Sequence, residues 1–327
     1  MEKSLKKRPL PVLQSINKWG TIIAIVVLLA FFTVIMPDIF LTSSNIINIL
    51  RSISIVTIIA IGLTVSLSVD GFDLSIGSSA TLSSSLIVSF FVWYNLPAGI
   101  AIPLAIVLTL SVALINMLLI VKIKIPDLFA TLSTMFIFEG VAMTYTGGGS
   151  ISEGMPRLDG SPTEGKLPVV FDKMGETPWI IIIMILVVMI VHVFLNHTKH
   201  GRYMYMIGGN IEAARLSGIP VNRYKTLAYV ISTLFAALGG IILASYLGSA
   251  QINSGAGYLM PAVAAAFIGS SFAGNGKPNA IGTFIGAALV GILENGLVMM
   301  SVPYYSLNIV KGMVLALALA STYYNRK

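Results

Sequence analysis

The sequence predicts an all-α polytopic membrane protein with about ten transmembrane helices. Apolar residues make up 56% of the 327 residues and charged residues only 10%, whereas a soluble domain carries roughly 25% charge. The mean hydropathy is +0.90, and apolar runs of roughly 20 residues, enough to cross the hydrocarbon core, recur along the chain. Lys and Arg lie at the ends of these runs, so the net charge of +7 indicates membrane topology and not nucleic-acid binding.

The apolar runs give the expected order of elements. Residues 1–18 form a basic arm, and no small-residue cleavage site clearly follows it, so the first run is expected to be an uncleaved span. Residues 19–327 then form a single transmembrane domain. Within it, the acidic segment 146–178 and the basic segment 196–225 are expected to lie outside the hydrocarbon core. The predicted spans are 19–36, 53–69, 76–93, 98–121, 128–145, 179–195, 226–247, 258–273, 280–300 and 304–320.

The distribution of Lys and Arg predicts the orientation of the spans. If the N-terminal arm is cytoplasmic, fifteen Lys and Arg residues fall on the cytoplasmic side and four outside, while Lys311 lies within the last span. Cytoplasmic connections carry such an excess of basic residues. Both termini and residues 196–225 are therefore expected in the cytoplasm, and residues 146–178 are expected to form an extracytoplasmic loop.

The order of the spans also predicts an internal repeat. The second to fifth spans and the seventh to tenth spans can form two four-helix units that flank the sixth span. The first unit begins outside and the second begins inside, so the two units are inverted relative to each other. Inverted repeats with interrupted helices are a common construction in transporters.

The basic cytoplasmic segment contains a predicted short helix. Asn210 is a good N-cap residue, Glu212 lies in the first turn, and Gly218 with Pro220 ends the helix. Such a helix protrudes from the membrane domain. The capping and helix-ending residues allow two interpretations of this helix: a docking site for another protein, or an ordinary loop helix.

Residues 208–218, from Gly-Gly-Asn to Arg-Leu-Ser-Gly, carry a family resemblance. They resemble the cytoplasmic coupling motif of importer permeases of the ATP-binding-cassette superfamily, in the form found in ribose-type monosaccharide permeases. Residues 71–78, 210–229 and 282–287 are similar to the same family. The resemblance implies that the short helix fits a cleft on a separate ATPase subunit. The coupling residues that it implies are Gly209, Asn210, Glu212, Ala213, Ala214, Arg215 and Gly218.

The resemblance also implies the partners of the chain. Members of the family are membrane subunits and not enzymes. They work in the bacterial inner membrane with ATPase subunits, an extracytoplasmic sugar-binding protein and a second permease copy or paralogue. The sequence has no G-x-x-x-x-G-K-[ST] loop, so no cofactor is expected on this chain, and ATP with Mg²⁺ is expected on the partner. The implied substrate is a small ribose-like sugar, whose identity the sequence leaves open.

Residues 69–78 hold the first candidate site within the membrane. Asp70 and Asp73 lie between two apolar spans, where ionisable groups usually face a cavity. If the segment is a broken helix, Asp73, Ser75 and Gly77 are candidates for the translocation pathway, with free backbone groups that can bind sugar hydroxyls. Alternatively, the segment is a cytoplasmic turn in which Asp73 is the N-cap of the next helix.

The other charges within predicted spans are Glu139, Glu294 and Lys311. We expect Glu294 to pair with Lys311, near Asn295 or Asn308, and thereby to stabilise the bundle. Glu294 and Asn295 are also candidates for the translocation pathway. An ion-coupled secondary transporter, in which intramembrane carboxylates carry the coupling ion, is the alternative function.

Two further patterns concern packing and metals. Gly282 and Gly286 form a G-x-x-x-G pair on an apolar run, which predicts close helix packing either within the chain or between subunits. The three His residues are too few, and too poorly supported by carboxylates, to predict a metal site.

Overall fold

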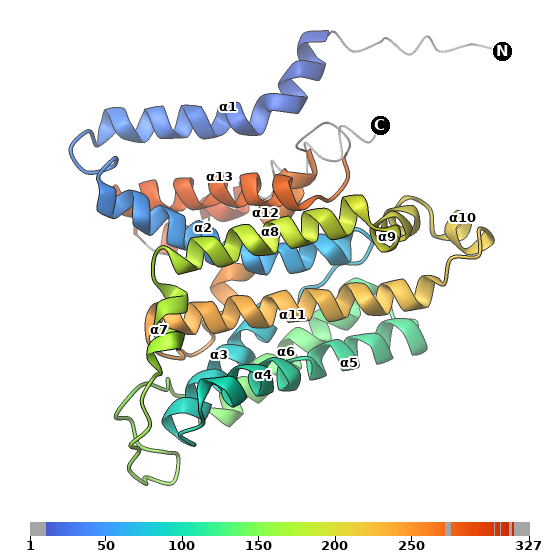
Figure 1. The fold of residues 1–327 in the computed structure, drawn as a ribbon. Coiled ribbons are helices and arrows are strands. Elements are labelled where there is room, and N and C mark those ends of the chain that lie inside the picture. The colour runs from blue at the N-terminus through green and yellow to red at the C-terminus, as the bar shows by residue number, and fades with distance from the viewer. Residues whose placement is uncertain (1–10, 272–275, 304, 308, 314–315, 317–327) are drawn as a thin grey trace, which may run out of the picture.

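The chain folds into a bundle of helices (Figure 1). The computed structural model describes residues 11–271, 276–303, 305–307, 309–313 and 316, and the regular elements in this part of the chain are helical. The predicted all-α class is therefore confirmed. The helices are α1 (Pro11–Ile35), α2 (Ser43–Leu67), α3 (Ile76–Val92), α4 (Ala98–Thr109), α5 (Ser111–Met117), the π-helical turn η1 (Leu118–Lys122), α6 (Asp127–Tyr145), α7 (Val169–Gly175), α8 (Trp179–His197), α9 (Lys199–Gly209), α10 (Ile211–Leu216), α11 (Val221–Leu247), α12 (Ala256–Ser271) and α13 (Ala280–Met299).

Within the described residues, six runs of helix are long and apolar enough to cross a membrane, with α4, α5 and η1 counted as one run. The shorter apolar helices in the described residues are α3, α12 and the Gly20–Ile35 part of α1. These elements coincide with the first nine predicted spans. The tenth predicted span, residues 304–320, lies largely outside the described residues. The chain is a polytopic membrane protein.

Helix α2 begins earlier than the hydropathy of the sequence predicts. It starts at Ser43 and not at residue 53, because the Thr42 hydroxyl caps it by accepting a hydrogen bond from the Asn45 amide at 3.3 Å. Arg51 therefore lies within the helix and not in a loop. The polar residues of its first turns lower the hydropathy without disfavouring a helix.

The centre of the bundle is formed by α2 and α11, which run antiparallel (Figure 1). Their backbones approach closely at Gly62, where a Cβ atom would lie 2.6 Å from the carbonyl oxygen of Ser232. Of the apolar stretch in each helix, 61% is buried in α2 and 67% in α11, against 28% in α8. The two central helices therefore form the core, and most of the apolar stretch of α8 is not buried within the chain.

Each central helix is followed by a break and a shorter helix. The inner break, residues 68–75, connects α2 to α3, and the outer break, residues 248–255, connects α11 to α12, so both breaks are eight residues long. Helix α3 packs on α11, and α12 packs on α2. Because α2 and α11 are antiparallel, the second arrangement is inverted relative to the first. This pairing supports the predicted inverted repeat for the first two helices of each unit.

Small residues hold α12 against α13. A Cβ atom on Gly282 would lie 2.2 Å from the carbonyl oxygen of Gly269. One on Gly286 would lie 2.2 Å from the carbonyl oxygen of Ala265. The G-x-x-x-G pair therefore packs within the chain, which decides between the two alternatives that the sequence left open.

We expect Gly286→Ala to lower the stability of the purified protein in detergent by about 2 kcal/mol, because the added methyl group overpacks the contact between α12 and α13. Gly140→Ala in α6 is the control, since a Cβ atom there meets no atom within 4 Å and alanine favours a helix. Thermal unfolding measures both effects. An unchanged melting temperature for Gly286→Ala would contradict this role of the glycine.

Candidate functional site

The α9–α10 segment, residues 199–218, projects at one end of the bundle, between α8 and α11 (Figure 1). The Thr198 hydroxyl caps α9 by accepting a hydrogen bond from the Gly201 amide at 3.1 Å. Asn210 Oδ1 caps α10 by accepting one from the Ala213 amide at 2.9 Å. The predicted short helix and the N-cap role of Asn210 are confirmed.

The chain turns sharply at the end of α10. Gly218 has a φ of +76°, in the left-handed region that favours glycine. Its amide donates a hydrogen bond to the Arg215 carbonyl oxygen at 3.0 Å, and the Ile219 amide donates one to the Ala214 carbonyl oxygen at 3.1 Å. Gly218 therefore ends the helix, as predicted from the sequence, and returns the chain to α11.

One face of α10 is buried and the other is open. Ala214 is 1% exposed, so it packs α10 onto the protein and does not reach an outside surface. Glu212, Ala213 and Arg215 are exposed. Leu216 is 89% exposed, and an exposed large apolar side chain at the tip of a projecting helix gives a partner apolar area to bury. Sequence patterns did not single out Leu216; the available signal was an apolar residue ending a short polar helix.

Glu212 and Arg215 pair with each other on the open face. Arg215 Nη1 donates a hydrogen bond to Glu212 Oε1 at 2.8 Å. The side chains are 67% exposed for Glu212 and 61% exposed for Arg215, so the pair contributes little stability. Both charges remain accessible to a partner.

The inner break lies directly beside the α9–α10 segment. A Cβ atom on Gly208, near the end of α9, would lie 2.5 Å from the carbonyl oxygen of Ser68 and 3.3 Å from the amide nitrogen of Asp70. Asp70 is exposed and has a φ of +57°, which is uncommon for residues other than glycine. Asp70 therefore forms the tip of a turn next to α9 and is not a charge buried among the spans.

Asp73 lies deeper in the inner break and is fully buried. Its Oδ1 accepts hydrogen bonds from the Ser75 amide at 2.9 Å and from the Ser75 hydroxyl at 2.5 Å. Asn116 Nδ2 donates to Ser75 Oγ at 2.9 Å, and the Thr134 hydroxyl donates to Asn116 Oδ1 at 2.6 Å. This network joins the inner break to α5 and α6.

Two interpretations of residues 69–78 were open from the sequence: a broken helix that lines the pathway, and a cytoplasmic turn in which Asp73 is an N-cap. Ser75 and Gly77 are buried like Asp73, so all three residues lie in the interior of the chain's own fold. Ser75, directly before α3, makes no side-chain cap bond. The capping bond comes from Asp73, whose Oδ1 accepts from the Ser75 amide two residues later, so Asp73 closes the turn and holds the start of α3 as an N-cap side chain does. Asn116 and Thr134, which the sequence did not reveal, hold this turn in place.

An ion pair and a hydrogen bond connect α6 to α11 beside the inner break. Asp127, at the start of α6, lies 3.1 Å from Lys225 Nζ and accepts a hydrogen bond from the Tyr229 hydroxyl at 2.7 Å. Gly71 of the inner break packs against Tyr229, since a Cβ atom added to Gly71 would lie 2.8 Å from Tyr229 Oη. Lys225 and Tyr229 are 98 and 102 residues from Asp127, so sequence patterns could not place them together.

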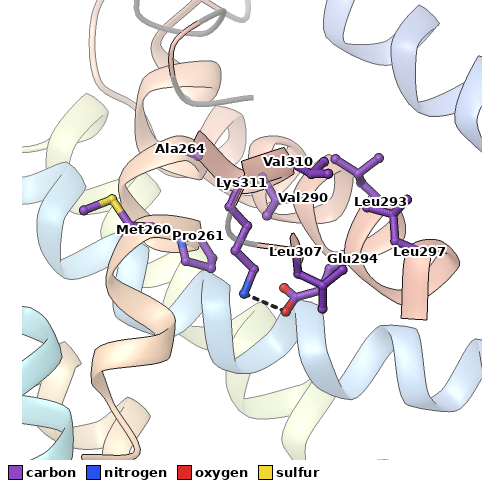
Figure 2. A pocket seen from close by; sticks show the side chains of 10 residues that line it. All are labelled: Met260, Pro261, Ala264, Val290, Leu293, Glu294, Leu297, Leu307, Val310 and Lys311. Carbon is purple, nitrogen blue, oxygen red and sulfur yellow. Dashed lines mark ion pairs between the residues drawn. The ribbon is translucent and has the colours of Figure 1, made fainter. Parts of the chain in front are cut away.

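A cleft lies between α12, α13 and the last described segment (Figure 2). Lys311 Nζ lies 2.8 Å from Glu294 Oε1 across the cleft, which confirms the predicted ion pair. Asn295 bonds elsewhere, since its Nδ2 donates to Asn45 Oδ1 at 3.0 Å, and Asn308 lies outside the described residues. The rest of the lining is apolar and consists of Met260, Pro261, Ala264, Val290, Leu293, Leu297, Leu307 and Val310.

Comparison with known proteins identifies the family. Residues 45–319 match the family described as the permease component of the branched-chain amino acid transport system. The chain belongs to this permease family. The permease is 36% identical to the ribose import permease of Escherichia coli (strain K12) over 299 residues, 91% of each chain. It is also 36% identical to that of Bacillus subtilis (strain 168) over 306 residues, 92% of this chain and 91% of the relative.

A further relative is named for a different cargo. The permease is 33% identical to the autoinducer 2 import system permease protein of Escherichia coli O9:H4 (strain HS) over 255 residues, 75% of this chain and 74% of the relative. No solved structure matches the permease. The resemblance to importer permeases is confirmed, and the permease is a transport subunit and not an enzyme. The family match spans α10, both breaks and the cleft at Glu294.

Proposed function

We propose that the permease is the membrane-spanning subunit of an ATP-binding-cassette importer, and that α10 binds a separate ATPase subunit. The observation that carries this proposal is the geometry of α10, a capped helix of six residues with Glu212, Arg215 and Leu216 on its open face. Leu216 offers apolar area at the centre of a contact, and the two charges orient the partner. ATP and Mg²⁺ bind to that partner.

The proposed substrate is a small ribose-like monosaccharide. Support comes from the 36% identity with ribose import permeases over 91% of the chain. An extracytoplasmic binding protein delivers the sugar and decides which sugar enters. The permease then provides the passage and the connection to the ATPase.

The proposed assembly contains two permease protomers, identical or paralogous, in the bacterial inner membrane. Both termini and the α9–α10 segment lie in the cytoplasm, and residues 146–178 lie outside, as the excess of Lys and Arg supports. The pathway runs between the protomers, because all 17 residues of α3 are buried and the centre of one protomer is packed. Glu294 in its open cleft is the best-placed pathway candidate, whereas Asn295 is held by Asn45.

Uptake by proteoliposomes tests the proposal. Permease reconstituted with its ATPase and its binding protein is expected to accumulate labelled ribose only when ATP is supplied to the ATPase. Permease alone under an imposed proton or sodium gradient is the control, and no uptake is expected. Gradient-driven uptake by the permease alone would overturn the proposal in favour of ion-coupled transport.

A further inference from the structure

The two breaks are attached to opposite ends of the permease (Figure 1). At the end that carries α10, Gly208 packs against the turn at Ser68. A Cβ atom added to Gly208 would lie only 2.5 Å from the Ser68 carbonyl oxygen. At the other end, Ala250 in the outer break pairs with Ile151 through two backbone hydrogen bonds of 2.9 Å. Ile151 belongs to the outer connection, residues 146–178. Each break is therefore fixed to a segment that lies outside the spans.

The outer connection is also fixed to the helices around the outer break. Ser245, near the end of α11, accepts a hydrogen bond from the Gly175 amide at 2.7 Å and donates one to the Phe171 carbonyl oxygen at 2.5 Å. Glu139 of α6 accepts a hydrogen bond from the side-chain amide of Asn253 in the break. The outer connection and the outer break therefore form one packed unit.

The outer break meets the start of α3, directly after the inner break, in the middle of the bundle. The Gly255 amide donates a hydrogen bond to the Thr81 hydroxyl oxygen at 2.9 Å. A Cβ atom on Gly255 would lie 2.2 Å from the carbonyl oxygen of Gly77 and 2.7 Å from the amide nitrogen of Thr81. No side chain fits between these backbones, so a displacement of α3, which follows the inner break, displaces the outer break.

We propose that the two breaks form a continuous contact path from the ATPase docking site to the surface that receives the binding protein. Gly208, Gly255 and Thr81 are its positioning residues. Movement of α10 and α9 displaces the Ser68 turn through Gly208. The hydrogen bonds of Asp73 carry this displacement to α3, and the Gly255 contact carries it to the outer break. The path rests on the proposed function, since both docking partners belong to it.

The decisive variant is Gly255→Ala in permease reconstituted with its ATPase and binding protein. Gly255 does not have a left-handed φ, so alanine alters the contact between the outer break and α3 without straining the backbone. We expect the ATPase to bind and to retain its basal ATP hydrolysis, while stimulation by the binding protein falls by about tenfold. Gly257→Ala is the matched control on the same end of α12, because a Cβ atom there meets no atom within 4 Å. It is expected to keep full stimulation.

Two further variants test the contact path even if Gly255→Ala does not fold. Thr81→Val preserves shape but removes the acceptor of the Gly255 amide, and Gly208→Ala disturbs the path at its other end. Each is expected to reduce stimulation by about fivefold. Normal stimulation in folded Thr81→Val and Gly208→Ala would overturn the path. If the ATPase does not bind the unmodified permease at all, the proposed function itself is wrong, and the path is overturned with it.

Discussion

Glu212→Lys is expected to abolish ATP-driven uptake by the reconstituted importer while leaving membrane insertion unchanged. The Glu212 side chain is 67% exposed, so the substitution disturbs no packed interior. Lys at this position replaces an ion pair with Arg215 by two like charges and reverses the charge that a partner meets. We expect the affinity for the ATPase to fall about 100-fold, on the order of 3 kcal/mol, as measured by co-purification and titration.

A charge-swapped variant separates the interface from the helix. Glu212→Arg combined with Arg215→Glu keeps an ion pair within α10 but reverses the charges on its open face. If the loss arises at the interface with the ATPase, this double variant stays inactive. Normal uptake by Glu212→Lys, or recovery in the double variant, would show that Glu212 does not contact the partner.

Lys225→Ala is expected to destabilise the permease by about 3 kcal/mol, because it leaves the carboxylate of Asp127 without its cation. The two side chains are only 16% and 15% exposed, so water cannot replace the lost partner fully. Thermal unfolding in detergent measures the loss. Lys225→Arg keeps the charge and is expected to cost less than about 1 kcal/mol.

A double variant checks the cause of this loss. Lys225→Ala combined with Asp127→Asn removes the unpaired charge together with its partner, and we expect it to recover a large part of the stability. An equal loss in the single and double variants would show that packing of the Lys225 stem, and not its charge, stabilises the contact between α6 and α11.

Features that depend on neighbouring residues, or on lipid as the solvent, could be predicted from the sequence. A chain this apolar must satisfy its backbone groups in helices, so the fold class follows from composition. The cap at Asn210 and the stop at Gly218 are local and were predicted correctly. The ion pair of Glu294 with Lys311 was also predictable, because isolated charges on two neighbouring spans stabilise each other.

Features that depend on distant contacts could not be predicted. Asn116 reaches Ser75 across 41 residues, so the network that buries Asp73 has no signature along the chain. The exposure of Leu216 was hidden because an apolar residue in a membrane protein is normally read as lipid-facing or buried. The early start of α2 depends on no distant contact, since Thr42 caps the helix locally; it was missed because the boundary was drawn from hydropathy alone.

The docking of a separate ATPase on α10 can be tested directly by cross-linking. The chain contains no cysteine, so Ser217→Cys introduces a single thiol on an exposed position beside Leu216. A photoreactive group attached to this thiol is expected to cross-link the permease to its ATPase in membranes. The same group on Leu158→Cys, in the outer connection at a residue that is 62% exposed, is expected to give no ATPase product. ATP-driven uptake without any cross-link from position 217 would contradict the docking of the ATPase on α10.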